Sequence, residues 1–496
     1  MDSVKLKIND LETEAPAGSM ILEAARLAGI EIPTLCYFKD ASPVGACRMC
    51  VVEVAGKPNL MPACATAISP GMEIWTESPS VLDSRRRTLD LICSHHRMAC
   101  EYCVRYKDCE LHELVRHYGL DDRKYTAAFA LPEEDSSSDH LVRDYSKCVL
   151  CRRCVSACER QATNVIGVFH RGVNTRISAP LPLNDTSCVS CGRCIAACPT
   201  GALREKDDTR QVWKAIRNRD KHVIAAVSPF VGGRLGEYFP EAGDAYTERK
   251  MVALLRRIGF RKVFGMAAGF DAAAEAESAL LEKGLKGGAA LPMISSNCPA
   301  AVRFIEYYYP ELGGNLSGCK SPRDSFAGLC KAEYAAQTGV DPKNIVLVAI
   351  DACTAAKSER RRPGAAVDVS LTSDELAAMI DQACVSRFTT LQVWKSLPEE
   401  DCDCFPGSDV DAEAICGDNG SIRQAVLRRT GRGVARAVTV SGLADAATLL
   451  NAVEAGDVDY DYIEILACPG GCLNGGGQHR LPGGLQTSVA EASSFA

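Results

Sequence analysis

The sequence lacks the features that would direct a chain to a membrane or to nucleic acid. No uninterrupted run of 18 apolar residues occurs in its 496 residues, so none can cross a bilayer as a helix. The start, MDSVKLKIND, has no cationic region followed by an apolar run, as a secretory signal would. The net charge of −7 leaves no basic stripe for nucleic acid and no polybasic segment for lipid. We expect a cytoplasmic protein that binds neither partner.

Cysteine, in contrast, is abundant, with 26 residues. Disulfides explain such a density poorly in a reducing cytosol, whereas thiols clustered at spacings of two and three residues suit metals. The length predicts two or more domains, and a hydrophobic content of 47% is ordinary for a globular protein. The sequence therefore predicts a multidomain metalloprotein.

Motif spacing divides the chain into four expected domains. Residues 1–78 predict a strand, a hairpin and a helix, and residues 79–138 predict a helix, a cysteine-bearing loop and a second helix. Residues 139–210 hold a cysteine repeat. In residues 211–496 apolar strands alternate with amphipathic helices, which predicts α/β layers with largely parallel sheets. The polar stretch LPEEDSSSDH, near residues 130–140, predicts a linker.

The repeat carries the strongest signal. CVLCRRCVSAC and CVSCGRCIAACP lie 40 residues apart and share the C-x-x-C-x-x-C-x-x-x-C spacing of two-cluster ferredoxins, in which the fourth cysteine ligates the other cluster. Two zinc sites are the alternative, although zinc needs fewer cysteines. The pattern predicts two 4Fe-4S clusters, one held by Cys148, Cys151, Cys154 and Cys198, and the other by Cys188, Cys191, Cys194 and Cys158.

Two further ligand sets precede the repeat. A close cysteine pair with outlying cysteines predicts a 2Fe-2S cluster, or alternatively a zinc site, on Cys36, Cys47, Cys50 and Cys64. A third 4Fe-4S cluster is expected on His96, Cys100, Cys103 and Cys109. His95 is an equal candidate by composition, but the spacing to the cysteines favours His96. Seven cysteines fall outside all sites: Cys93, Cys319, Cys330, Cys384, Cys402, Cys404 and Cys416.

The order of these sites resembles the FeFe (iron-only) hydrogenases that carry accessory clusters, and the N-terminal part is also similar to the large iron–sulfur subunit of respiratory complex I. The motifs SSNCP, DACTAAKSE and ACPGGCLNGGGQ are similar to the three that hold the H-cluster, a 4Fe-4S cubane joined to a diiron unit. The resemblance implies a β-grasp 2Fe-2S domain, a His/Cys cluster domain, a bacterial-type 2x4Fe-4S ferredoxin domain and a two-lobed α/β domain. It also implies four cubane ligands: Cys298, Cys353, Cys468 and Cys472.

Several positions depart from the family pattern. Asn297 stands where the family has a proton-transferring cysteine. Ala356 stands where the family has a lysine that contacts the diiron unit, and Lys357 follows it. Residues that usually flank that unit are replaced by Asp351, Leu466 and Arg323. Two outer members of the family's proton path correspond to Glu277 and Ser317, although residues of these types are more often an ordinary surface acid and a helix-cap serine. The residues expected to act in catalysis are Asn297, Glu277, Ser317 and Lys357.

The resemblance implies reversible H2 oxidation or proton reduction, with electrons passing through the accessory clusters. Expected partners are a ferredoxin or NAD(P)H-oxidising flavin and iron–sulfur subunits. Loss of the proton-transferring cysteine predicts altered turnover. Two alternatives remain open: an H2 sensor, and an electron-transfer subunit that keeps the cubane and lacks the diiron unit. Infrared bands of carbon monoxide and cyanide ligands would distinguish a hydrogenase or an H2 sensor from the electron-transfer subunit, which would lack these bands.

Overall fold

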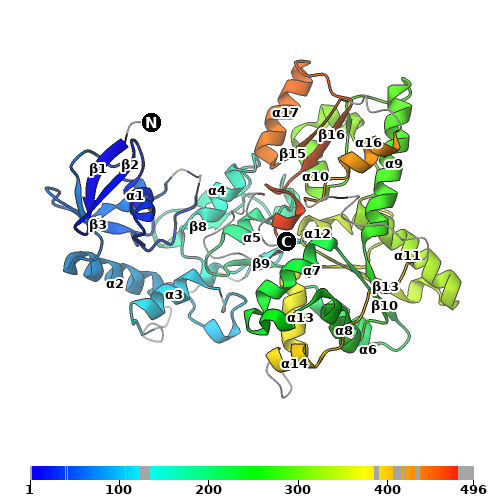
Figure 1. Cartoon of the computed structure of the whole chain (residues 1–496), viewed down its shortest axis with the longest axis horizontal. Helices are drawn as coiled ribbons and strands as arrows, with labels where there is room; N and C mark the ends of the chain where they lie inside the picture. Colours follow the sequence, from blue (N-terminus) through cyan, green and yellow to red (C-terminus); the bar gives the residue numbers. More distant parts are fainter. Residues whose placement is uncertain are drawn as a thin grey trace.

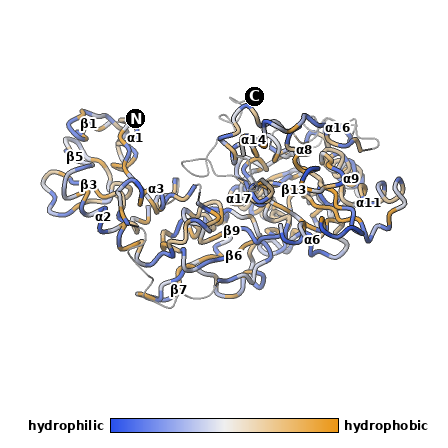
Figure 2. Tube along the Cα trace, turned by 90° about the horizontal axis from the view of Figure 1, so that it is seen from below, coloured by the Kyte–Doolittle hydropathy of each residue, from blue (hydrophilic) through white to orange (hydrophobic). Residues whose placement is uncertain are grey.

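The computed structural model describes residues 3–39, 41, 43–106, 108–121, 134–384, 390–405, 416, 419–430 and 436–478. It is an elongated molecule in which the N-terminal sheet lies at one end and a larger body of two sheets at the other (Figures 1 and 2). The segment that carries α4 and α5 lies between them (Figure 1). In the described part of the chain, none of the helices is long and apolar enough to cross a membrane.

The N-terminal segment forms a five-stranded sheet in the order β2-β1-β5-β3-β4. The hairpin predicted near the start is confirmed, because β1 and β2 pair antiparallel with Ile8 opposite Leu11. Helix α1 packs its buried residues Ile21, Leu22, Ala24 and Ala25 into the core beneath this sheet. The elements are β1 (Ser3–Ile8), β2 (Leu11–Pro16), α1 (Ile21–Leu27), β3 (Val51–Val54), β4 (Met61–Pro62) and β5 (Glu73–Trp75).

Two helices follow, as predicted, and they flank a loop that bears cysteine. They are α2 (Pro79–Ser94) and α3 (Glu110–His117). Pro79 at the first position of α2 suits a helix start, because its missing N–H has no intrahelical partner there. The buried residues of α2 and α3 pack in one apolar cluster with Leu35, Cys36 and Met49 of the first segment.

The cysteine repeat folds around the short helices α4 (Arg153–Glu159) and α5 (Arg193–Ala197), which contact each other. Two small antiparallel pairs enclose them, β6 (Leu141–Arg143) with β9 (Leu203–Glu205), and β7 (Gly167–Phe169) with β8 (Arg176–Ser178). The linker expected at residues 130–140 is wrong where the structure describes it. Asp135 pairs with Arg143 through two backbone hydrogen bonds of 2.8 Å, and His140 is buried. Residues 130–133 of that stretch lie outside the described residues.

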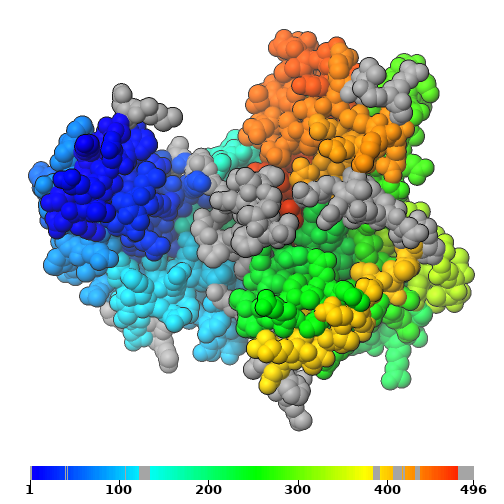
Figure 3. Space-filling model, viewed as in Figure 1, coloured from blue at the N-terminus to red at the C-terminus, as the bar shows by residue number. Residues whose placement is uncertain are grey.

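The C-terminal part contains two parallel sheets, which confirms the predicted α/β layering. A four-stranded sheet has the order β11-β10-β13-β14, and a three-stranded sheet has the order β12-β16-β15. Figure 3 shows the corresponding two lobes, one green to yellow and the other orange. The strands are β10 (His222–Val227), β11 (Lys262–Gly265), β12 (Met293–Ile294), β13 (Ile345–Asp351), β14 (Val369–Thr372), β15 (Ala437–Ser441) and β16 (Tyr462–Leu466).

Helices cover both faces of these sheets, so the central strands are mostly apolar, as is usual for buried parallel strands. Alternate residues of β10 and β13 enter two different cores, one shared with α6, α8 and α13 and the other with α11. The helices of this part are α6 (Thr209–Arg217), α7 (Pro229–Leu235), α8 (Glu248–Ile258), α9 (Ala267–Leu285), α10 (Pro299–Tyr308), α11 (Pro322–Thr338), α12 (Ala355–Glu359), α13 (Ser373–Cys384), α14 (Thr390–Ser396), α16 (Arg423–Arg429) and α17 (Leu443–Ala455).

Candidate metal centres and active site

Four thiols from three loops line one cavity between the two sheets: those of Cys298, Cys353, Cys468 and Cys472. Each loop follows the carboxyl end of a parallel strand, since Cys298 comes after β12, Cys353 after β13, and the other two after β16. Ligand sites of open α/β sheets form at these strand ends. The structure therefore brings together the four cysteines that the sequence assigned to one cubane.

The loop that carries the last two cysteines packs tightly against the cysteine repeat. A Cβ on Gly476 would lie 2.4 Å from the backbone oxygen of Cys191, and a Cβ on Gly192 would lie 3.0 Å from the Cα of Gly476. No side chain fits at either position, so the two backbones touch. The close neighbour of Gly476 is protein backbone, which explains why glycine is needed there.

Burial raises the pKa of each thiol in the cavity, and it raises that of Cys468 to about 11. A buried thiolate without a counter-charge is costly, so the metal-free site favours protonated sulfur. Metals bind thiolate and displace the proton, and iron–sulfur clusters are held by sets of cysteine thiolates. The donor set thus fits a 4Fe-4S cubane.

The two halves of the cysteine repeat adopt matching backbone conformations. Leu150 and Arg152 have φ values of 53° and 64°, and Ser190 and Gly192, 40 residues later, have 60° and 69°. Left-handed conformations are uncommon for residues other than glycine, so their repetition marks a shared loop shape. The same curled loop presents three thiols in each half.

The fourth thiol of each half faces the opposite loop, as the spacing predicts. Burial raises the pKa of Cys148 to about 11, and Cys198 from the second half adds to that rise. Likewise the pKa of Cys194 is raised by burial and then by nearby Cys188 and Cys158. The cysteines that lie near one another are therefore those that the sequence assigns to the same cluster.

The four N-terminal cysteines are mutual neighbours and all are buried. The backbone N–H of Cys47 donates to Cys36 Sγ at 3.5 Å. Hydrogen bonds with Cys47 and Cys64 lower the pKa of Cys36, and a hydrogen bond with Cys36 raises that of Cys64. Thiols that share protons in this way suit a metal cluster that would replace those protons.

Of the two neighbouring histidines, His96 has the environment of a ligand. It is buried, and its Nδ1 has no hydrogen-bond partner in the described part of the structure, whereas His95 is exposed and contacts Ser94 Oγ at 3.0 Å. Burial lowers the pKa of His96 to about 4, which keeps the imidazole neutral and able to bind metal. The spacing argument therefore agrees with the side-chain environment.

The thiol groups are distributed over three apolar clusters. Cys151 of the repeat packs in one cluster with Cys36 and Cys47 of the first segment and Cys109 of the second. The repeat's own core contains Cys148, Cys154, Cys158, Cys188, Cys194 and Cys198. Cys191 packs in a third cluster with Cys298 and Cys353 of the cavity. Among the described residues, no group of three or more His, Cys, Asp or Glu side chains is arranged to hold a single metal ion.

The structure also joins three of the four residues expected in catalysis. Ser317 Oγ donates to Glu277 Oε1 at 2.8 Å, Ser295 Oγ donates to the same oxygen at 3.0 Å, and the Asn297 N–H donates to Ser295 Oγ at 3.2 Å. Glu277 is only 1% exposed, so its interpretation as an ordinary exposed acid is wrong. Burial raises its pKa, although hydrogen bonds from Tyr462 and Ser317 oppose the rise.

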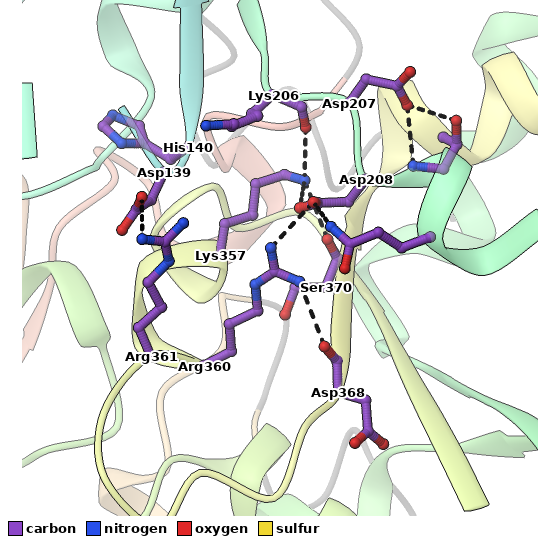
Figure 4. Close-up of polar contacts among 12 residues, drawn as sticks. Asp139, His140, Lys206, Asp207, Asp208, Lys357, Arg360, Arg361, Asp368 and Ser370 are labelled. Carbon is purple, nitrogen blue, oxygen red and sulfur yellow. Dashed lines mark hydrogen bonds and ion pairs between the residues drawn. The ribbon is translucent and has the colours of Figure 1, made fainter. Parts of the chain in front are cut away.

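Lys357, the fourth of these residues, lies outside the cavity. Its fully buried Nζ donates to Asp208 Oδ2 at 2.7 Å, to Glu375 Oε1 at 2.9 Å and to the backbone oxygen of Lys206 at 3.0 Å. Figure 4 shows the side chain directed at Asp208 and Lys206. Because an ammonium has three protons, these contacts leave none for a group in the cavity. The prediction that Lys357 acts in catalysis at the cavity is therefore wrong, because its side chain lies elsewhere.

A buried ion pair occupies the position beside Cys353. Arg323 Nη1 and Asp351 Oδ2 are 2.5 Å apart, and Arg323 Nη2 lies 3.3 Å from Glu359 Oε2. Burial raises the pKa of Cys353, and the Arg323 charge opposes that rise. Leu466, the third departure noted above, lines the cavity itself. Arg323 and Asp351, which both depart from the family pattern, are thus partners in one ion pair.

Sequence reasoning missed Glu464, which lies directly behind Asn297. Its carboxylate is fully buried and accepts from the Ile422 N–H at 2.8 Å, from Thr439 Oγ1 at 3.1 Å and from Asn297 Nδ2 at 3.4 Å. Burial raises its pKa. An acid inside the apolar strand YIEIL of β16 was the available signal, because acids are almost never fully buried without partners.

The cysteines outside the sites differ in burial, and Cys319 is half-buried. Cys93, Cys330 and Cys416 are buried, which is the expected apolar role for Cys93, and Cys402 and Cys404 are exposed. Residues 406–415 of the acidic stretch near these last cysteines lie outside the described residues, as does the side chain of Cys384.

Four family models match the chain. The C-terminal domain of the iron-only hydrogenase large subunit matches residues 221–476, and the 2Fe-2S iron–sulfur cluster binding domain matches residues 1–79. The 4Fe-4S dicluster domain matches residues 147–202, and the NADH-ubiquinone oxidoreductase-G iron–sulfur binding region matches residues 85–124. These matches follow the order of the thiol groups along the chain.

Two similar proteins match nearly the whole length of this chain, and a third matches about a third of it. The NADP-reducing hydrogenase subunit HndD of Solidesulfovibrio fructosivorans is 34% identical, covering 96% of this chain and 89% of its own. Iron hydrogenase 1 of Clostridium pasteurianum is 33% identical, covering 95% and 88%. The NADH-ubiquinone oxidoreductase 75 kDa subunit of Reclinomonas americana is 34% identical over 35% of this chain and 26% of its own.

A variant of the FeFe-hydrogenase HydA1 from Chlamydomonas reinhardtii shares the fold, with a TM-score of 0.50 and 24% identity over 58% of this chain and 87% of that one. The family model of the C-terminal part, the two relatives that match nearly end to end and the four-thiol cavity all agree. The chain is an iron–sulfur oxidoreductase with 2Fe-2S and 4Fe-4S binding domains, and it belongs to the iron-only (FeFe) hydrogenase family.

Proposed function

We propose that this protein oxidises H2 or reduces protons at the four-thiol cavity and exchanges the electrons through accessory clusters. Its four domains are residues 1–78, with a β-grasp fold, residues 79–138, residues 139–210 and residues 211–496. They hold one 2Fe-2S cluster, three accessory 4Fe-4S clusters and the cubane of an H-cluster, on the nineteen cysteines and His96 assigned above. When bound, a diiron unit beside the cubane would supply the chemistry that interconverts H2 and protons.

One observation carries this proposal: thiols of neighbouring sites pack in the same apolar clusters. Cys151 packs with thiols of the two N-terminal sites, and Cys191 lines the cavity beside Cys298 and Cys468. Clusters held by these thiols would lie in sequence from the N-terminal end to the buried cavity. That arrangement suits an electron relay between a partner at the N-terminal end and a reaction at the cavity.

The residues around Asn297 support a slow proton step. Glu277 and Ser317 hydrogen-bond to each other and connect through Ser295 to the backbone of Asn297. An amide side chain donates and accepts hydrogen bonds, but it does not gain and lose a proton near neutral pH. Protons held by Glu277 would therefore lack an ionisable group for the last step toward the cavity.

A second function is favoured by the ion pair of Arg323 and Asp351. In this alternative the cavity holds the cubane alone, and the protein is an electron-transfer subunit. A buried pair of opposite charges, only 6% and 4% exposed, forms a polar wall beside Cys353. It replaces two uncharged residues that would flank a diiron unit in the resemblance, so the cavity differs there from that of the standard hydrogenases.

The partner follows from the relatives. One similar protein is named as a subunit of an NADP-reducing hydrogenase, and another as a subunit of NADH-ubiquinone oxidoreductase. We propose that the N-terminal clusters exchange electrons with an NAD(P)H-oxidising flavin and iron–sulfur subunit, or with a ferredoxin. Reduction of the purified holoprotein by such a subunit with NAD(P)H would test this proposal.

Metal analysis and infrared spectroscopy test the function. After anaerobic reconstitution, iron should reach about 18 atoms per chain for the five clusters, and about 20 with a diiron unit. Zinc in place of iron would overturn the relay. Infrared bands of carbon monoxide and cyanide ligands in protein matured with the diiron assembly factors would support hydrogenase chemistry. With iron near 18 and no such bands, the electron-transfer alternative holds.

A further inference from the structure

Two arginines occupy the same position in the two halves of the cysteine repeat. Arg153 and Arg193 each directly precede the third cysteine of their loop, 40 residues apart. They are only 8% and 6% exposed, although arginine is almost never buried without a partner. The repeat therefore directs one buried cation toward each end of the two-cluster segment.

The two arginines differ in what balances their charge. Arg153 forms a bidentate pair with Glu110, with nitrogen–oxygen distances of 2.6 Å and 2.7 Å. Arg193 Nη1 donates to the backbone oxygen of Asn474 at 2.9 Å. Among the described residues no carboxylate forms an ion pair with Arg193, and the negative groups that act on it are Cys468 and Cys191.

The absence of a carboxylate beside Arg193 has a physical consequence. A buried cation without a counter-charge is strongly destabilising, since its desolvation is not repaid. Its neighbours Cys191 and Cys468 belong to different ligand sets, and both line the cavity. Cluster-bound thiolates are anionic, so clusters on these two sets would supply the missing negative charge from either side.

We propose that Arg193 is a positioning residue that stabilises the reduced state of both clusters between which it lies. The inference rests on the proposed cluster ligands. One electron leaves one cluster and enters the other, no bond forms or breaks, and the guanidinium stays protonated throughout. Because its charge is close to both, it favours the added electron on either cluster and raises both potentials. It also fixes the two loops together through Asn474.

The first half of the repeat provides matched controls. Arg152, beside Arg153, is exposed, so its removal changes the net charge of the same kind of loop without changing a buried charge. Arg153 already has its charge balanced by Glu110. Loss of Arg193 should therefore affect the potentials more than loss of either neighbour in the first half.

The test is a redox titration of the anaerobic holoprotein, followed by electron paramagnetic resonance. In Arg193→Gln, the equilibrium constant for reducing the cavity cubane and the adjacent cluster should fall at least about tenfold, which is 59 mV for one electron. Arg193→Lys should stay within about threefold of the wild type, because it keeps the charge. Arg152→Gln should leave both potentials unchanged, and Arg153→Gln should shift them less than Arg193→Gln.

Several outcomes would overturn the inference. One is full iron occupancy in Arg193→Gln with neither potential moved, and another is an equal shift in Arg152→Gln. If Arg193→Gln does not retain its clusters, Arg193→Met serves instead, since it leaves no unpaired polar group. Cluster loss in both neutral variants would show that Arg193 only holds the loop of Asn474 in place. Absence of cluster signals from the wild type would instead reject the proposed function.

Discussion

Replacing Lys357 by methionine tests whether the buried ammonium holds the repeat segment onto the α/β part. Lys357 lies on α12, and its partner Asp208 lies just before α6. Glu375, on α13, is the second carboxylate, at 2.8 Å from Nζ. Methionine keeps the length of the side chain and removes its charge, so both carboxylates lose this cation, although Arg360 still contacts Asp208 at 3.1 Å.

The expected cost follows from burial. Asp208 and Glu375 are 2% and 6% exposed. Breaking a buried pair by removing one partner costs about 3–5 kcal/mol. At 2–4 °C for each kcal/mol in a domain of this size, the melting temperature should fall by roughly 6–20 °C.

The loss should also depend on pH. Burial raises the pKa of Glu375, and Lys357 opposes the rise, so the variant raises the folded-state pKa further. A carboxyl with a raised folded-state pKa binds more protons folded than unfolded, and stability therefore falls as pH rises above its unfolded pKa of about 4.3. The deficit of the variant should shrink as pH is lowered from about 8 toward about 5.

Thermal unfolding of the anaerobic holoprotein, at fixed scan rate and iron content, measures this effect. The control is Lys331→Met, which breaks a more exposed pair with Asp368 at 2.7 Å and should cost no more than about 1 kcal/mol. The double variant Lys357→Met, Glu375→Gln should recover part of the loss. Equal melting temperatures for Lys357→Met and Lys331→Met would refute the role given to Lys357.

Three further predictions concern the metal sites. His96→Cys should keep its cluster but lower the reduction potential of that cluster, because a thiolate adds negative charge. A redox titration in which only His95→Cys shifts the potential would show that His95, not His96, is the ligand. In protein whose diiron unit is confirmed by infrared bands, Asn297→Cys should raise H2 evolution at least about tenfold, and an unchanged rate would refute a missing proton relay. Arg323→Gln should destabilise by about 3–5 kcal/mol in thermal unfolding, and Arg323→Gln with Asp351→Met by less, since the double variant leaves only the partly exposed Glu359 without its partner; equal losses would contradict this.

Local patterns in the sequence predicted much of the fold. The apolar runs that became β10, β13 and β16 and the amphipathic helices α8 and α13 needed only the spacing of side chains along the chain. The cysteine spacings equally predicted the thiol groups, because a loop of fixed length brings its thiols together wherever it lies. These features depend on residues close in sequence.

Contacts between distant segments could not be predicted in this way. Lys357 and Asp208 are 149 residues apart, and nothing in either neighbourhood signals the other. Glu277 resembles an exposed acid in its helix, and its burial follows from contact with Tyr462 on strand β16, whose hydroxyl donates to it at 2.6 Å. Charged groups become buried only where packing supplies partners, so their positions depend on the tertiary structure.

Charges of both signs lie around the cavity. Arg193 acts on the ligand thiol of Cys468, so it favours electrons on a cluster held there, whereas the charge of Arg323 is offset by Asp351. The acids Glu277 and Glu464 lie behind Asn297, and burial raises the pKa of each, which favours the protonated form. In the proposed hydrogenase, electron acceptance and proton storage would both have residues that favour them, and the side chain between them is an amide. Turnover in this protein should be limited at that one position, which is why restoring an ionisable side chain there tests the hydrogenase function more directly than changing either acid.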